Sequence, residues 1–497
     1  MENNLINIFF VPEVSLAILA IACLMYGLFS KNNSFNKATN FATLSLIFVS
    51  FLVYFDFTTN FALFENFFSN TTFTKFFKIL TILGAAASLI ISKNYFIDTK
   101  INRFEIPTLL LFSTLGMMLM ISSKNLMMMY LAIELQSLSL YVVASIKRNS
   151  LESAESGVKY FILGALSSGI LLYGFSLVYG FTGQTNFDGI YISLSQLDKL
   201  PIGLVFGLVF ILVGLAFKVS AVPFHMWTPD VYEGAPTSIT AFFAIVPKLA
   251  AIALIFRFCL EPFNNFYFEW TQVIFFLSLA SMFLGAIAAI AQKSIKRLLA
   301  YSSIGHVGYV LIALVAASDQ GIRSASIYMF IYLIMNISVF AILLSLKKSD
   351  KYVEKIDELS GLSKTNPVVS VSLAIIMLSM AGIPPFIGFF GKFYVFIAAI
   401  ESQQYILAIL GVLASVISAF YYLRIIKGMY FDEVIEGENF DFTINNQAKV
   451  ILLTLLFLIT FFIIYPSLLT GIVSGITKPS WSKVQFEVII KLPIIFT

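Results

Sequence analysis

The sequence predicts an all-α polytopic membrane protein with about fourteen transmembrane helices. Of its 497 residues, 59% are hydrophobic and only 12% are charged, and the mean hydropathy is +0.91. A helix needs about 20 apolar residues to cross a bilayer, and runs of that length recur along the whole chain. No polar stretch exceeds about twenty residues, which is too short for an independent soluble domain. The basic residues are scattered, so a nucleic-acid partner is not indicated.

The apolar runs place the predicted helices in order along the chain. They fall at 9–29, 39–55, 76–92, 106–122, 125–146, 157–180, 202–228, 237–260, 270–291, 298–317, 324–346, 367–400, 404–427 and 450–476. The seventh run contains Pro223, and the twelfth contains Pro384 and Pro385. Proline removes a backbone donor and clashes with the preceding turn, so both helices are expected to be broken.

The distribution of Lys and Arg predicts the topology, because short cytoplasmic loops collect basic residues. Eighteen of the 31 basic residues fall in or beside the loops that follow helices 1, 3, 5, 9, 11 and 13, between Lys31 and Lys449. Only seven fall on the opposite side or the tail. Both termini are therefore predicted to lie outside.

Six basic residues remain inside the predicted helices. They are Lys78, Lys159, Lys218, Lys248, Arg257 and Lys392. Lys78 and Arg257 fall near segment ends, where a long side chain reaches the headgroups, so both are interpreted as structural. The other four are lysines whose burial would cost about 2.5 to 3.5 kcal/mol each on insertion scales, which marks them as functional candidates.

Glu134 is the one carboxylate that is flanked deeply enough by apolar sequence to be placed inside a helix. Glu134, in MMMYLAIELQSLSLYVVAS, lies deep in helix 5, whereas Glu13 follows Pro12 near a helix end and is expected to face water. Glu134 and Lys159 lie on consecutive helices, and opposite charges at low dielectric favour each other's ionised forms. Such a pair can tune a proton carrier. The alternative is a static buried ion pair that fixes the helix register.

Lys218 and Lys248 surround the first predicted break. Lys218 precedes Pro223 by five residues, and Lys248 directly follows Pro247. The negative end of a half-helix would stabilise a protonated Lys218. A break in a membrane helix leaves backbone carbonyls without partners, and such backbone is tolerated at membrane depth only where it is buried in protein or lines a water-filled cavity. A proton path needs such a cavity. The alternative is a proline kink with a snorkelling lysine.

The two histidines and two cysteines complete the candidate list. His306, near Ser302 and Tyr309, could bridge protons between the two halves of the chain or simply pack, and His225 could serve an entry path or a structural role. Cys23 and Cys259 lie in apolar runs without metal-ligand spacing, which favours a packing role. No redox centre or metal site is predicted in this chain.

Five stretches resemble the antiporter-like membrane subunits of proton-pumping NADH:quinone oxidoreductase, respiratory complex I. They read YLAIELQSLSLY, ESAESGVKYFILGALSSGILLYGFSLVYG, FKVSAVPFHMWTPDVYEGAPT, QKSIKRLLAYSSIGHVGYVLIA and ELSGLSKTNP with AGIPPFIGFFGK. They span Tyr130 to Lys392. Outside them, helices 1 to 3 and 14 are matched mainly by position and hydropathy.

The resemblance implies two inverted five-helix repeats, each with a broken helix. The implied division is residues 1–105 for helices 1 to 3, 106–260 for the first repeat, 261–428 for the second, and 429–497 for helix 14 and the tail. The implied relay residues are Glu134, Lys159, Lys218, Lys248 and Lys392. NADH, FMN, iron-sulfur clusters and quinone would be bound by other subunits of the electron transport complex. The implied partners are those membrane-arm subunits and the lipid bilayer. The implied setting is a bacterial inner membrane, with a mitochondrial inner membrane as the alternative.

Two other functions stay open at this point. One is a subunit of a multisubunit cation/proton antiporter, which shares the fold and the Glu/Lys arrangement. The other is a membrane scaffold that fixes a neighbouring subunit without transporting anything. The scaffold predicts that lysine substitutions alter assembly but never proton flux.

Overall fold

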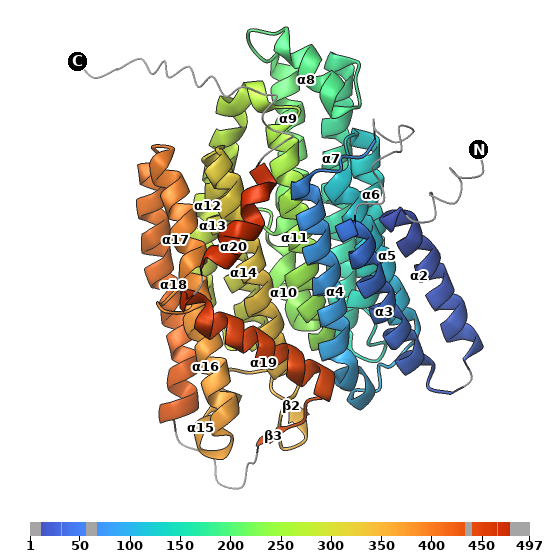
Figure 1. Ribbon diagram of the computed structural model, residues 1–497, viewed down its shortest axis with the longest axis vertical. Coiled ribbons are helices and arrows are strands. Elements are labelled where there is room, and N and C mark those ends of the chain that lie inside the picture. The colour runs from blue at the N-terminus through green and yellow to red at the C-terminus, as the bar shows by residue number, and fades with distance from the viewer. Residues whose placement is uncertain (1–10, 31, 56–66, 433–439, 465, 478–497) are drawn as a thin grey trace.

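The computed structural model describes residues 11–30, 32–55, 67–432, 440–464 and 466–477. It contains a bundle of long helices, with α2 and α3 at one edge and α17 and α18 at the opposite edge (Figure 1). Thirteen helices in the described part are long and apolar enough to cross a membrane. These are α2 Pro12–Phe29, α3 Ser34–Phe55, α4 Thr72–Asp98, α5 Glu105–Ser122, α6 Leu126–Ala144, α7 Leu151–Thr182, α9 Ile202–Val219, α11 Thr237–Leu260, α12 Tyr267–Ile290, α13 Ile295–Val315, α14 Asp319–Leu343, α18 Tyr405–Phe431 and α19 Asn446–Phe461.

The remaining elements are short. The helices are α8 Phe187–Ser195, α10 Trp227–Gly234, α15 Leu362–Thr365, α16 Pro367–Ala381, α17 Ile387–Glu401 and α20 Ser467–Ser474, and the strands are β1 Leu346–Lys348, β2 Lys351–Tyr352 and β3 Phe440–Phe442. The helices α16 and α17 are the two parts of the predicted twelfth segment, and each of the other thirteen predicted segments overlaps one of the membrane-length helices. The fourteenth, predicted as one run over 450–476, is divided into α19 and α20. The helix α7 begins six residues before the predicted start at residue 157, and the small sheet was not predicted from hydropathy.

Three of the helices that carry candidate residues, α6, α7 and α13, begin at short polar side chains. The Asn125 side chain accepts a hydrogen bond from the Met127 amide at the start of α6. Ser150 and Ser294 do the same for the amides of the third residue after them, at the starts of α7 and α13. Each cap satisfies one of the free donors that every helix N-terminus presents.

Both predicted breaks are confirmed, and they share one geometry. The helix α9 ends at Ser220 with φ of 65°, and α16 ends at Gly382 with φ of 85°. In each case the amide of the left-handed residue bonds back to two carbonyls of the last turn. Glycine adopts this conformation freely, whereas serine does so rarely. The chain then re-enters a helix as α10 after the first break and as α17 after the second.

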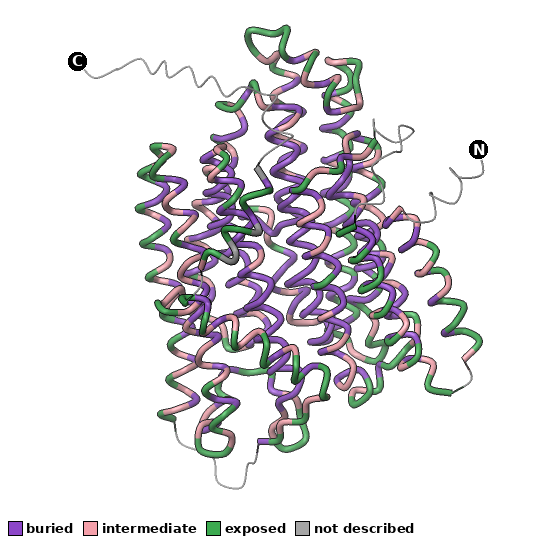
Figure 2. Tube along the Cα trace, in the orientation of Figure 1, coloured by how far each residue is buried: buried purple, intermediate pink, exposed green. Residues whose placement is uncertain are grey.

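The core of the bundle is α11, in which every residue is buried. Figure 2 shows the buried trace at the centre and exposed turns at the edges and ends. Pro247 lies inside α11 and has no amide hydrogen to give to the carbonyl of Phe243. The Tyr232 hydroxyl donates to that carbonyl at 2.9 Å instead. The proline is thus accommodated without leaving a polar group unsatisfied at membrane depth.

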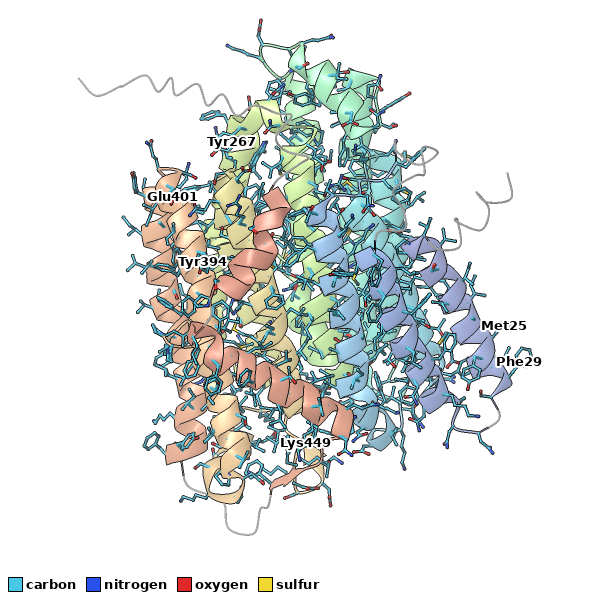
Figure 3. All side chains as sticks on the ribbon, in the orientation of Figure 1. Met25, Phe29, Tyr267, Tyr394, Glu401 and Lys449 are labelled. Carbon is cyan, nitrogen blue, oxygen red and sulfur yellow. The ribbon has the colours of Figure 1, made fainter. Side chains whose placement is uncertain are left out.

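A three-stranded antiparallel sheet, ordered β2-β1-β3, lies at the end of the bundle opposite α8 (Figure 1). The Lys347 ammonium lies 2.6 Å from a carboxylate oxygen of Asp98, at the end of α4, and the Tyr352 hydroxyl donates to that oxygen at 2.8 Å. Figure 3 shows Lys449 toward this end and Tyr267 and Glu401 toward the other. The sheet therefore joins the second half of the chain to the third predicted segment.

Two predictions about the first three segments are wrong. Lys78 does not reach the headgroups, and Glu13 does not face water, because their side chains form an ion pair in which both residues are more than nine-tenths buried. The helices α2, α3, α4 and α5 pack together and enclose the pair. Sequence position alone could not reveal it, since each residue lies near the end of its own segment while its partner is 65 residues away.

We expect Lys78→Met to lower the stability of the subunit by about 3 to 5 kcal/mol, because it leaves the Glu13 carboxylate buried without a partner. Replacing both residues, as in Glu13→Leu with Lys78→Met, should recover most of this loss. The thermal inactivation midpoint of the assembled protein measures both effects. Additive losses in the double variant would contradict the pairing.

Candidate functional site

The first group of candidate residues lies between α6 and the end of α9. Lys218 is in the last turn of α9, is buried, and donates a hydrogen bond of 2.6 Å to the Ser137 hydroxyl on α6. Ser137 follows Glu134 by three residues, so the two side chains share one face of the helix. The Oε1 atom of Glu134 is buried without a hydrogen-bond partner. A carboxylate, a hydroxyl and a lysine therefore line one side of the first break.

Lys248 occupies the middle of the central helix α11 and is almost completely buried. Its ammonium donates to the Ser303 hydroxyl on α13 and lies 5.6 Å from the centre of the Tyr232 ring. A cation above an aromatic face is attracted by the ring quadrupole. Lys248 is thus bonded to the second half of the chain while lying against a side chain of α10.

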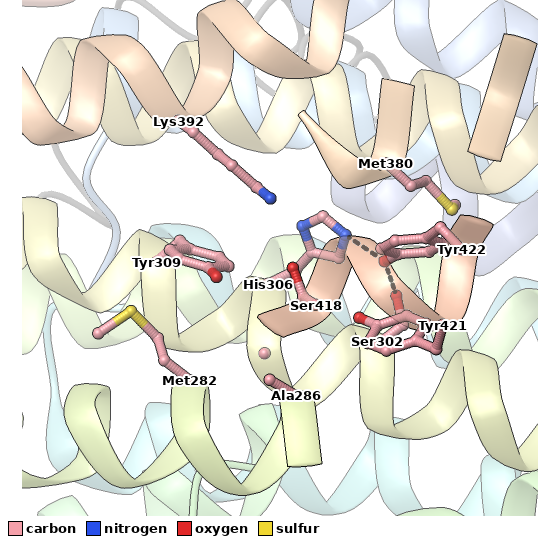
Figure 4. Close-up of a pocket in the computed structure, with 11 residues that line it drawn as sticks. Met282, Ala286, Ser302, His306, Tyr309, Met380, Lys392, Ser418, Tyr421 and Tyr422 are labelled. Atoms are coloured by element: carbon pink, nitrogen blue, oxygen red, sulfur yellow. Dashed lines mark hydrogen bonds between the residues drawn. The ribbon is translucent and has the colours of Figure 1, made fainter. Parts of the chain in front are cut away.

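His306 lies on the same helix as Ser303, in a shell of tyrosines. Its Nδ1 atom is 2.6 Å from the Tyr328 hydroxyl, and its Nε2 atom is 3.2 Å from the Tyr422 hydroxyl. The Tyr422 hydroxyl also bonds to Ser302 (Figure 4). A neutral imidazole donates through one nitrogen and accepts through the other, so His306 can pass a proton between the two hydroxyls.

Lys392 lies just beyond the second break, on α17. Its ammonium donates to the Ala381 carbonyl and to the Ser415 hydroxyl, both at 2.8 Å, and lies 4.9 Å from the centre of the Tyr309 ring. Ala381 is the last residue of α16, and the broken helix leaves its carbonyl free to accept. Lys392 and His306 both line a small cavity of about 10 Å³, which is roughly the space that one water molecule needs (Figure 4).

Lys159 is not placed as predicted. It does not form a salt bridge with Glu134, and its side chain is 41% exposed. Its ammonium lies 2.7 Å from Glu155 on the same helix and 2.8 Å from Asp230 on α10. The prediction assumed that consecutive helices turn their charged faces toward each other, whereas α7 turns Lys159 toward the second half of the broken helix.

Comparison with known proteins places these residues in a family. A family model described as NADH:quinone oxidoreductase/Mrp antiporter, TM, matches residues 123–418, which is more than half of the chain. NADH-quinone oxidoreductase subunit N of Pelagibacter ubique is 52% identical over 469 residues, 94% of this chain and 98% of that protein. Subunit N 1 of Rhizobium meliloti is 52% identical over 419 residues, 84% of this chain and 87% of that protein.

The chain belongs to the NADH-quinone oxidoreductase subunit N family. A chain of respiratory complex I from Thermus thermophilus has a TM-score of 0.78 and 29% identity, covering 93% of this chain and 99% of that one. A chain of the Mrp complex from Dietzia has a TM-score of 0.81 at 19% identity, covering 96% of this chain and 98% of that one, and so shares the fold alone. The antiporter-like fold predicted from the sequence is confirmed.

In this subunit N chain, His225 lies in the turn between α9 and α10 and is half-buried. Its Nδ1 atom is buried without a hydrogen-bond partner. Asp230 and Glu233, the acidic residues that follow His225 in the sequence, form salt bridges with Lys159 and Arg297 instead. Its two possible roles stay open.

Three basic residues that hydropathy assigned to loops or helix ends turn out to have specific partners. Lys296 is buried and donates to the Ala235 carbonyl at 3.2 Å. Arg297 lies 2.9 Å from Asp230 and 2.8 Å from Glu233. Arg257 is fully buried and donates to Glu261 and to two carbonyls at the end of α5. A subunit N sequence carries no local signal for these contacts, because each partner lies on another helix or beyond the helix end.

Proposed function

We propose that this chain moves protons across the membrane as the antiporter-like membrane-arm subunit of NADH:quinone oxidoreductase, driven by redox chemistry in other subunits. One observation carries the proposal. Lys218, Lys248 and Lys392 are each buried, and each donates to a neutral hydroxyl or carbonyl oxygen. In the described part of the chain, none of the three has a carboxylate within salt-bridge distance.

Such lysines suit proton transfer. Burying an ammonium ion without a carboxylate raises the free energy of the folded protein. A lysine can remove this cost by releasing its proton, whereas an arginine stays charged. Moving one charge against 100 mV takes about 2.3 kcal/mol, so rearrangement of buried charges can drive the step. Three lysines of this kind, with Glu134 at one end, form the relay that the proposal requires.

The second half of the relay is nearly continuous. Lys248 bonds to Ser303, whose neighbour Ser302 bonds to Tyr422, and Tyr422 bonds to His306. His306 and Lys392 line the same cavity. The hydroxyls of serine and tyrosine both donate and accept, so they can pass a proton along this series. His306 therefore serves as a proton bridge and not only as a packed side chain.

We expect Lys248→Ala to reduce protons pumped per NADH oxidised at least fivefold, because it removes the carrier between the two breaks. The measurement is NADH-driven acidification of sealed membrane vesicles containing the whole complex, with NADH oxidation and subunit content recorded in parallel. Lys199→Ala, in an exposed loop, is the matched control and should pump normally. Normal pumping by assembled Lys248→Ala complex would remove this residue from the relay.

The same measurement separates the alternatives. A scaffold would lose assembly without any change in protons pumped per NADH in the complex that remains. A subunit of a cation/proton antiporter would exchange protons for sodium or potassium without NADH. The relatives that are about half identical carry the name of NADH-quinone oxidoreductase subunit N, whereas the Mrp likeness is one of fold.

The proposal includes location, orientation and cofactors. The chain lies in the bacterial inner membrane with both termini outside, which the basic residues on the small sheet support because they gather on the side opposite α8. Labelling Lys351→Cys from the cytoplasm tests this.

The proposed division of the chain remains 1–105, 106–260, 261–428 and 429–497. The left-handed residues that end α9 and α16 support the two repeats, because they give both breaks the same geometry. NADH, FMN, iron-sulfur clusters and quinone bind to other subunits.

A further inference from the structure

Asp230 bonds to both halves of the chain at once. One carboxylate oxygen lies 2.8 Å from the Lys159 ammonium on α7, and the other lies 2.9 Å from the Arg297 guanidinium on α13. Glu233, one turn further along α10, adds a second contact of 2.8 Å to Arg297. The helix α7 belongs to the proposed first repeat and α13 to the second. One carboxylate on the short helix α10 therefore connects them.

The stability of the fold does not explain this arrangement. The side chains of Lys159, Asp230 and Arg297 are 41%, 33% and 31% exposed. Where water reaches ion pairs as exposed as these, they contribute between zero and about 1 kcal/mol, because solvent screens them. The chain also contains a matched pair, Lys124 with Asp188, which lies at the end of the bundle with no link to the buried lysines. A role beyond stability must come from what α10 itself contacts.

The helix α10 is bonded to the turn that holds Lys218. The Trp227 indole donates to the carbonyl of Phe217 at 3.0 Å, and the Thr228 hydroxyl donates to the Ser220 hydroxyl at 2.6 Å. Phe217 precedes Lys218, and Ser220 is the left-handed residue that ends α9. A displacement of α10 therefore moves the backbone on both sides of Lys218.

A second contact connects α10 to the neighbourhood of Lys159. The Trp227 ring stacks on the ring of Tyr160, with centres 4.4 Å apart and planes within 7°. Tyr160 follows Lys159 directly on α7. Close contacts therefore connect Lys159 and Tyr160 on α7 to α10, and α10 to the last turn of α9, where Lys218 lies.

Building on the proposed proton relay, we propose that Asp230 is a positioning residue that transmits a change at Lys159 to Lys218 and to the second repeat. When Lys159 leaves Asp230, the carboxylate remains held by Arg297 alone, and α10 shifts toward α13. Trp227 and Thr228 carry that shift to the turn that ends α9. The Lys218 ammonium then moves relative to Ser137 and Glu134, which changes its proton affinity.

The test compares Asp230→Asn, which keeps the shape and removes the charge, with Asp230→Glu, which keeps the charge. Asp230→Asn should lower protons pumped per NADH at least threefold in the assembled complex. Asp230→Glu should restore at least half of the loss. Asp188→Asn, which breaks the matched surface pair, should pump normally. Normal pumping by Asp230→Asn, or an equal loss in Asp230→Glu, would overturn the proposal.

Two further variants test the route. Lys159→Met combined with Asp230→Asn should pump no worse than the poorer single variant, because both act on one contact, whereas multiplied losses would show independent roles. Thr228→Val removes the bond to Ser220 without changing any charge and should lower pumping at least twofold. This variant decides the proposal if Asp230→Asn assembles poorly, since normal pumping by Thr228→Val would disprove the link to Lys218. Lys248→Ala belongs in the same series. If Lys248→Ala pumps normally, the relay itself fails, whereas a loss in Lys248→Ala with normal pumping in Asp230→Asn contradicts only the role of Asp230.

Discussion

Lys218→Ala is expected to abolish proton pumping by the assembled complex, with a loss of at least tenfold in protons per NADH oxidised. Lys218 is the only described basic residue in α9, and the methyl group of alanine cannot carry a proton or bond to Ser137. The loss should exceed that of any other single lysine variant in the relay, because α9 offers no second lysine that could take over. Vesicle acidification with parallel NADH oxidation measures it.

The companion variants show which part of the Lys218 environment matters. Glu134→Ala should reduce pumping to a similar extent, because it removes the buried carboxylate one turn from the Ser137 hydroxyl that Lys218 contacts. Ser137→Ala removes the hydrogen bond that the Lys218 ammonium donates and should reduce pumping at least twofold, since a hydrogen bond to a charged group is worth about 1.5 to 3 kcal/mol. Full pumping stoichiometry in both Lys218→Ala and Glu134→Ala, with assembly verified, would exclude these residues from the relay.

The architecture was largely predictable from the sequence because the bilayer imposes strong rules. Segment lengths, the two proline breaks and the unusual burial of Lys218, Lys248 and Lys392 all follow from apolar runs and from subtraction of the loop charges. Each rule concerns a property of one segment alone. The predictions that failed required knowledge of which helix faces lie against each other.

The sequence does not indicate helix faces well in this protein, since the side exposed to lipid is as apolar as the core. Exposed Leu131 and Leu138 on α6 alternate with buried Ile133 and Leu140, so no polar stripe marks the outside. The partners of Lys159, Lys78 and Arg257 therefore could not be inferred. The role of Tyr422 could not be predicted either, because a tyrosine in an apolar run is usually a packing residue. Only the structure shows that its hydroxyl lies between Ser302 and His306.

Arg257→Ala is expected to remove most of the assembled subunit from the membrane, which is the largest structural effect predicted here. The guanidinium is fully buried and uses four bonds. Nη1 donates to the carbonyls of Ile121 and Ser123 at 2.7 and 2.8 Å, while Nε and Nη2 donate to the two carboxylate oxygens of Glu261 at 2.8 and 2.7 Å. Ile121 and Ser123 lie at the end of α5, whose last carbonyls have no partners within the helix.

The expected loss follows from what alanine leaves behind. Two carbonyls and a carboxylate would lose their donor at once, and breaking a buried charged contact by removing one partner costs about 3 to 5 kcal/mol. Arg257→Lys should also be poorly tolerated, because one ammonium cannot reproduce the planar fork that bonds to Glu261 while reaching α5. Native gels of solubilised membranes and the thermal inactivation midpoint of NADH oxidation measure both variants. Arg148→Ala, at an exposed arginine, is the control. Normal complex levels and an unchanged midpoint in Arg257→Ala would show that α5 and α11 are held together by apolar packing alone.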